Sequence, residues 1–132
     1  EATAEVLSMS KRQQDLDNGI KKMLAFNDPD GDVITKVSVG LTRPVWTASE
    51  TGLKLVDLAN RLSTQLGQPF HHESSGGGSD GNFTGAMGIP TLDGLGVAGD
   101  KYHTLEEHIE IDSLSMRGKM MAGLLMGIDK NL

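Results

Sequence analysis

The sequence has no cysteine, few aromatic residues and fewer basic than acidic side chains. Without cysteine, disulfides, thiolate metal sites and thiol nucleophiles are all excluded. A formal charge of −6 disfavours a surface that neutralises nucleic-acid phosphates. The longest apolar stretch, residues 120–128, is shorter than the roughly 20 residues that a membrane crossing needs. We therefore expect a soluble chain whose partners include neither nucleic acid nor a membrane.

The 132 residues suffice for one modest core, built mainly from aliphatic side chains and seven methionines. The chain begins at Glu1, not at Met, and shows no basic-then-apolar signal segment. We interpret it as a piece of a longer protein. The pattern fits a cytoplasmic location as well as a periplasmic or secreted one.

Three stretches have the apolar spacing of amphipathic helices. The helix expected at residues 10–26 begins with a capping box made by Ser10 and Gln13. The helix expected at residues 47–66 begins with a second one, made by Thr47 and Glu50. The second helix carries a continuous stripe of leucine and alanine. A last helix is expected to start at Asp112 or Ser113, where Gly118, Gly123 and Gly127 resemble a face for close packing.

Alternating apolar and polar residues predict strands between these helices. Residues 33–41 show the clearest alternation, residues 1–9, 70–74 and 89–97 weaker patterns, and residues 109–111 a brief extended piece. The pair Arg43–Pro44 interrupts the pattern, since the residue before proline is disfavoured in a helix. Helices alternating with strands predict a layered α/β architecture with a boundary at this pair.

The glycine-rich turn at residues 75–81 precedes a short helix that ends at Gly88. Such a turn can direct backbone N–H groups at an anionic or carbonyl-bearing ligand, or it can be a plain turn. The motif that binds nucleoside triphosphates is absent, because no Lys-Ser or Lys-Thr follows the glycines. The glycine spacing of dinucleotide-binding sites, with its later acidic residue, is absent too. Arg43 can hold a carboxylate through two parallel hydrogen bonds, or remain a solvated residue at a strand end.

The four histidines differ as candidate metal ligands. His71 and His72 are adjacent, so in a strand they point to opposite faces and cannot share one ion. His103 lies in a loop after a predicted strand, which is where open α/β sheets place their sites. His108 is expected at the surface beside a strand. The acidic pair at 106–107 can supply a base or metal ligands, but consecutive carboxylates are usually solvated.

Several blocks, in this order, resemble the C-terminal part of the co-catalytic zinc amidohydrolases. This family includes glutamate carboxypeptidases of the folate-cleaving type, acetylornithine deacetylase and succinyl-diaminopimelate desuccinylase. The blocks are Gly-Gly-Gly-Ser-Asp-Gly-Asn-Phe at 76–83, Gly-Ile-Pro-Thr-Leu-Asp-Gly-Leu-Gly at 88–96, His-Thr-Leu-Glu-Glu at 103–107 and Ile-Glu-Ile-Asp-Ser-Leu at 109–114.

The resemblance implies a fold in two parts. Residues 43–132 are expected to form the C-terminal half of a three-layer α/β catalytic domain. Residues 1–42 are expected to complete a two-layer α+β lid or dimerisation domain. By matching position, the resemblance assigns Arg43 to the substrate carboxylate, Gly77, Gly78 and Ser79 to the substrate pocket, and His103 to the last zinc ligand.

The resemblance also implies a chemistry: two zinc ions and a carboxylate base direct water onto an amide or peptide bond next to a carboxylate-bearing residue. The expected substrates are acyl-amino acids or peptides, and the expected assembly is a homodimer. A catalytic zinc site needs about three protein ligands, and only His103 matches here. We therefore expect the isolated chain to be inactive. The alternatives are a dimerisation or binding module, or a pseudo-enzyme that binds carboxylates through Arg43 and the glycine-rich turn.

Overall fold

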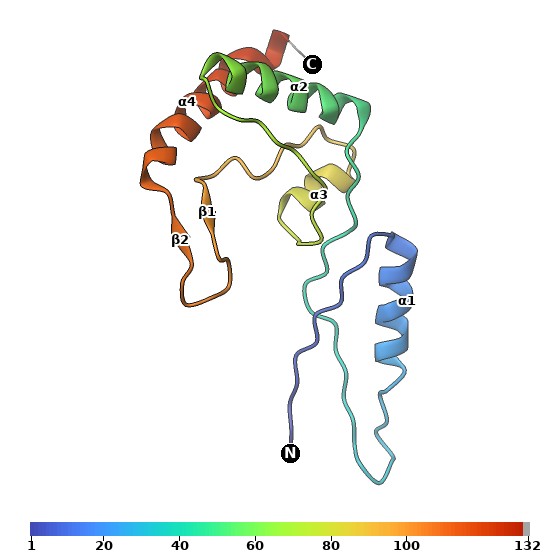
Figure 1. Ribbon diagram of the computed structural model, residues 1–132. Coiled ribbons are helices and arrows are strands. Elements are labelled where there is room, and N and C mark those ends of the chain that lie inside the picture. Colours follow the sequence, from blue (N-terminus) through green and yellow to red (C-terminus); the bar gives the residue numbers. More distant parts are fainter. Residues whose placement is uncertain (131–132) are drawn as a thin grey trace.

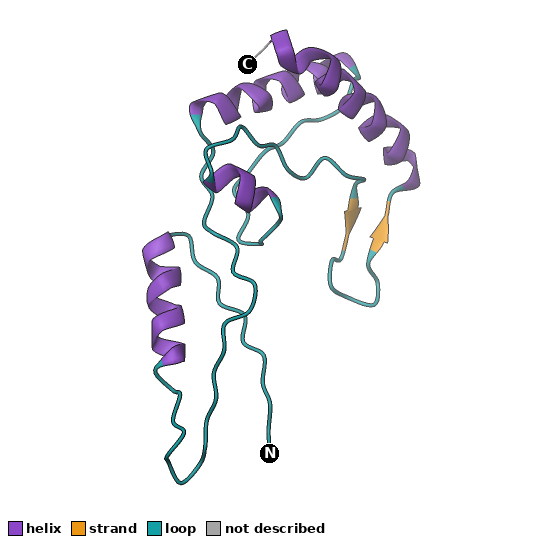
Figure 2. Ribbon diagram, turned by 180° about the vertical axis from the view of Figure 1, so that it is seen from behind, coloured by secondary structure: helices purple, strands orange, loops and turns teal. Residues whose placement is uncertain are grey.

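The structure is a computed structural model that describes residues 1–130 (Figure 1). Helices account for most of its regular structure, and the two strands form one short hairpin (Figure 2). In chain order the elements are α1 (Gln13–Leu24), α2 (Glu50–Gln65), α3 (Gly81–Ala86), β1 (Gly99–Asp100), β2 (His108–Ile109), α4 (Ile111–Gly127) and a final 3₁₀ turn, Ile128–Lys130.

The core lies between α2 and α4, which are far apart in sequence and cross at one end of the molecule (Figure 1). Leu58 and Ala59 of α2 are buried against Met120 and Leu124 of α4. This confirms the apolar stripe expected on the second helix. Partly buried hydrophobic residues surround the cluster: Leu62, Leu66, Phe70, Leu92 and Leu95.

The glycines of α4 have different surroundings. A Cβ atom at Gly123 would lie 2.9 Å from Cδ2 of Leu62, so the absence of a side chain lets α2 approach α4 closely at this point. A Cβ atom at Gly118 would meet nothing within 4 Å. The expected glycine packing face is therefore confirmed at Gly123 and wrong at Gly118, which lies on an open part of the helix.

All three long helices start at other residues than the sequence patterns predicted. Helix α2 has Ser49 as its N-cap, whose hydroxyl oxygen accepts a 3.0 Å hydrogen bond from the N–H of Gly52. Thr47 is therefore not the cap. Ser10 is not the cap of α1, because Arg12 occupies that position. The Ser10 hydroxyl accepts a 3.2 Å hydrogen bond from the Arg12 N–H. Helix α4 begins at Ile111, before the predicted Asp112 or Ser113.

Most of the predicted strands do not form within residues 1–130. Residues 33–41 contribute only one isolated bridge, between Thr35 and Asp28, and residues 1–9, 70–74 and 89–97 have no strand pairing. A strand needs a neighbour for its backbone N–H and C=O groups, and the described residues provide few. The predicted sheet layer is therefore reduced to the β1–β2 hairpin.

The hairpin pairs Gly99 with Ile109 and Asp100 with His108 in antiparallel register. The loop between its strands holds two residues in the left-handed region, Lys101 at φ 58° and His103 at φ 63°. Side chains other than glycine adopt this conformation rarely, at a cost of roughly 1–2 kcal/mol. The loop that carries the candidate histidine is therefore strained at that histidine.

The molecule exposes much more surface than a compact protein of its mass. Its accessible area is 10526 Å², whereas a folded 14.1 kDa monomer exposes about 6,700 Å². Much of the excess is apolar, for example Leu7 at 83 % and Leu41 at 76 % exposed. Helix α1 and the extended segments beside it lie apart from the α2–α4 pair (Figure 1). Among residues 1–130, no helix is long and apolar enough to cross a membrane.

Replacing the α2 cap should cost stability, whereas replacing the residue that the sequence pattern favoured should not. We expect Ser49→Ala to lower the free energy of unfolding by about 1 kcal/mol, because the N–H of Gly52 loses its partner. Thr47→Ala is the matched control. Urea denaturation, followed by the fluorescence of Trp46, measures both; equal losses would contradict the assignment of the cap.

The strain at His103 should appear as a preference for glycine. We expect the free energy of unfolding of His103→Gly to be about 1 kcal/mol higher than that of His103→Ala. Both substitutions remove the imidazole, and only glycine adopts φ 63° without cost. The same pair of substitutions at exposed Leu105, which has no positive φ, should show the opposite order. Thermal or urea denaturation measures the stability of all four variants. If His103→Ala were more stable than His103→Gly, the strain at position 103 would be refuted.

Candidate functional site

A groove of about 1130 Å³ brings the candidate residues together. Arg43, Gly77, Gly78 and His103 all line it, although up to 60 residues separate them in the chain. The N-terminal segment, one side of α1 and residues 36–45 form the remaining walls. Ser79 is not among the lining residues, but it directly follows Gly78 in the chain. The site thus combines both parts of the chain with the hairpin loop.

Arg43 lies along the glycine-rich turn. Its guanidinium Nη2 is 3.1 Å from Oδ1 of Asp80, and its Cδ would lie 3.2 Å from a Cβ atom at Gly78. Glycine at position 78 therefore leaves the space that the arginine side chain passes through. The side chain is 38 % exposed, so part of the guanidinium faces water. Of the five N–H donors of arginine, one is engaged by Asp80 within residues 1–130.

The glycine-rich turn is held by hydrogen bonds to its own side chains. The Gly77 N–H donates to the Ser75 hydroxyl at 3.0 Å, and the Gly81 N–H donates to the Ser79 hydroxyl at 3.1 Å. The N–H groups of Gly76 and Gly78 have no hydrogen-bond partner within the described part of the chain. Two donors beside an arginine are a chemically suitable environment for a carboxylate or a carbonyl oxygen.

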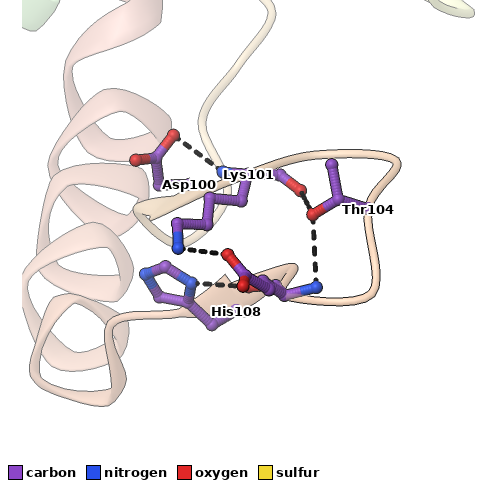
Figure 3. Close-up of polar contacts among 5 residues, drawn as sticks. Asp100, Lys101, Thr104 and His108 are labelled. Atoms are coloured by element: carbon purple, nitrogen blue, oxygen red, sulfur yellow. Dashed lines mark hydrogen bonds and ion pairs between the residues drawn. The ribbon is translucent and has the colours of Figure 1, made fainter.

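His103 is exposed, and its backbone N–H donates to Oε2 of Glu107 at 3.2 Å. Figure 3 shows how the rest of the loop is held: the Thr104 hydroxyl donates to the Lys101 carbonyl at 2.7 Å and accepts from the Glu106 N–H at 3.2 Å. The Lys101 ammonium also pairs with the Glu106 carboxylate. Both glutamates therefore hold the loop that presents His103 to the groove.

The other histidines lie outside the groove. His71 and His72 are exposed in a loop, not in the predicted strand, and Nε2 of His71 is 3.5 Å from Oε2 of Glu73. His108 is exposed at the start of β2, as expected, and its Nδ1 is 2.9 Å from the Glu106 carbonyl oxygen. Of the four histidines, His103 alone lines the groove.

The described residues do not complete a metal site. Within residues 1–130, no three His, Asp or Glu side chains lie close enough together to hold one ion. A catalytic zinc site needs about three protein ligands, so His103 falls short on donor number. The residues present thus fit one ligand position of a zinc site and not a whole site.

Two residues that join the segments around the groove were not identified from the sequence: Asn82, which lines the groove, and Trp46, which does not. Asn82 donates to the Pro44 carbonyl at 2.8 Å and accepts from the Ser79 N–H at 2.9 Å. Trp46 lies against α3 at Gly85, where a Cβ atom would come within 2.2 Å of the indole. Both contacts join residues 44–46 to 79–85, a separation that no local pattern reports. The one available signal was that Trp46 is the single tryptophan of the sequence, and this indicates no partner for it.

The chain is similar to known hydrolases. The model of peptidase family M20/M25/M40 matches residues 11–127. Carboxypeptidase G2 of Pseudomonas sp. strain RS-16 is 35 % identical over 102 residues, which are 76 % of this chain and 24 % of that protein. Succinyl-diaminopimelate desuccinylase of Helicobacter pylori is 32 % identical over 87 residues, which are 66 % of this chain and 22 % of that protein.

Protein YqjE of Bacillus subtilis, whose function is uncharacterised, is 32 % identical over 76 residues, which are 58 % of this chain and 20 % of that protein. The chain thus spans about a quarter or less of the length of each of these relatives. No solved structure is significantly similar to it. Because the family model matches most of its length, the chain belongs to peptidase family M20/M25/M40.

Proposed function

We propose that this chain supplies the carboxylate-binding part of a zinc-dependent metallopeptidase or amidohydrolase. Its substrate is an acyl-amino acid or peptide whose scissile amide lies next to a carboxylate-bearing residue. The groove shared by Arg43, Gly77, Gly78 and His103 carries the proposal, because these side chains and backbone groups meet there from three separate parts of the chain. Membership of the M20 family supports hydrolysis of an amide bond.

Each residue has a distinct proposed role. Arg43 binds the substrate carboxylate with the N–H groups of its guanidinium that Asp80 leaves available. The turn at Gly77, Gly78 and Ser79 forms the wall beside it. His103 is one zinc ligand, held toward the groove by the loop between β1 and β2. Zinc, when bound, supplies Lewis-acid chemistry at the scissile carbonyl or at water.

The proposed division of the chain follows from the same roles. Residues 1–42 belong to a lid or dimerisation domain, and residues 43–132 belong to the returning half of a three-layer catalytic domain. Helix α1 lies apart from α2 and α4, which supports the division (Figure 1). The Val45 N–H donates to Oε1 of Gln13 at 2.9 Å and so ties the two parts together next to the groove.

The experiment uses the natural protein that contains this chain, loaded with zinc. It should hydrolyse an N-acyl-L-glutamate and prefer it over the same compound with the α-carboxylate converted to a carboxamide. Arg43→Met should lower this preference tenfold or more, about the loss expected for one charge-assisted hydrogen-bonded pair. Arg12→Met is the matched control, because Arg12 pairs with Asp15 at the start of α1.

Two further measurements in the same experiment test the metal role. His103→Ala should lower the zinc content of the protein, measured by elemental analysis after gel filtration. The isolated 132-residue chain should hydrolyse neither compound, with or without added zinc. Turnover by the isolated chain, or an unchanged zinc content in the histidine variant, would overturn the assignment of His103.

We also propose that residues 1–42 mediate association of two copies. Residues 33–41 are extended and leave backbone groups and apolar side chains exposed, with Val33 at 76 % and Ile34 at 75 %. Such an edge is suited to pairing with another chain. Multi-angle light scattering should show a dimer that Ile34→Lys dissociates and Met126→Lys, at an exposed position of α4, does not. A monomer at micromolar concentration would refute the pairing.

A further inference from the structure

Asn82 connects two segments of the groove that the chain sequence places 38 residues apart. It lies in the first turn of α3 and is partly buried. Its Nδ2 donates a 2.8 Å hydrogen bond to the Pro44 carbonyl, and its Oδ1 accepts a 2.9 Å hydrogen bond from the Ser79 N–H. One side chain therefore fixes the backbone next to Arg43 relative to the backbone next to Gly78.

The direct contact between Arg43 and this turn is weaker. The Asp80 side chain that pairs with Arg43 is 89 % exposed, and exposed ion pairs contribute about 0–1 kcal/mol. The two hydrogen bonds of Asn82 are partly buried, where removing one partner leaves a polar group without compensation. Asn82 thus determines the spacing between arginine and turn more firmly than Asp80 does.

We propose that Asn82 is a positioning residue for the substrate carboxylate. It acts by holding the Arg43 guanidinium at a fixed distance from the N–H groups of Gly76 and Gly78, so that one carboxylate meets both sets of donors. The inference rests on the proposed function, which assigns the carboxylate to Arg43. Asn82 itself need not touch the substrate, because its two polar atoms are already engaged by Pro44 and Ser79.

The chemistry of the contact requires an asparagine. At this contact Pro44 presents its carbonyl oxygen and Ser79 its backbone N–H, so a side chain that bridges them must carry one donor and one acceptor on a short planar group. An ionised aspartate accepts from Ser79 but repels the Pro44 carbonyl oxygen. Alanine makes neither bond. The two substitutions therefore separate the Ser79 bond from the Pro44 bond.

The test compares selectivity and not activity alone. In the zinc-loaded natural protein, kcat and KM are measured for the N-acyl-L-glutamate and for its α-carboxamide. We expect Asn82→Ala to raise KM for the carboxylate compound about tenfold, with kcat and the carboxamide reaction little changed. Asn82→Asp should have a similar effect, because it loses the bond to Pro44. Asn60→Ala, at an exposed position of α2 whose side chain makes no hydrogen bond with residues 1–130, is the matched control.

The outcomes separate this inference from the proposed function. Equal losses on both compounds would show that Asn82 only stabilises the fold and would overturn the inference. It would also be overturned if Arg43→Met abolished the preference for the carboxylate while both Asn82 variants retained it. If Arg43→Met kept the preference, or the wild-type protein hydrolysed neither compound, the proposed function itself would fail. The melting temperature of each variant identifies misfolding, and Asn82→Asp carries the test where Asn82→Ala does not fold.

Discussion

The packing of α2 against α4 is the contact on which the rest of the structure depends. Leu58 and Ala59 meet Met120 and Leu124 there, and Gly123 admits the side chain of Leu62. Burying such a side chain stabilises a protein by roughly 1.5–3 kcal/mol, so a cluster of this size holds two helices together and little more. From the two ends of this helix pair the chain extends to the groove. Residues 44–49 lead down from the start of α2, and the β1–β2 hairpin leads into the start of α4 (Figure 1).

The helices were predictable from sequence because their pattern is local. An apolar stripe at a spacing of three and four residues identifies the buried face of α2 without knowledge of its partner. The strands depend on neighbours. Residues 33–41 and 89–97 alternate as strands do, yet their backbone groups find few partners within residues 1–130. The predicted cap of α2 was wrong for another reason. Ser49 and Thr47 are both suitable capping residues, and the path of the chain after Pro44 decides between them.

In the candidate site, too, the features that are local in sequence were predictable and the contacts between distant residues were not. The blocks around Gly77, Gly78 and His103 are short and continuous, so their order along the chain supports a family resemblance that the match to residues 11–127 then confirmed. Their roles in binding remain predictions. The contacts of Asn82 with Pro44 and of Trp46 with Gly85 cross about 38 residues of intervening chain, and no spacing rule reports them. Sequence reasoning therefore named residues that line the groove and missed those that join the segments around it.

The proposal that this chain is one part of a larger hydrolase accounts for both the exposed surface and the incomplete metal site. The accessible area exceeds that of a compact protein of this mass by more than the roughly 1,200–2,000 Å² that a standard protein–protein interface buries. A second copy packed on residues 33–41 would therefore cover only part of it. The apolar groove beside α4, lined by Leu92, Leu95 and Leu125, would stay open. Additional polypeptide that adds strands beside residues 89–97 would cover this second surface, and metal ligands carried on it would complete the proposed site at His103. Folding and metal binding would then be coupled, because the surface that completes the core also completes the site.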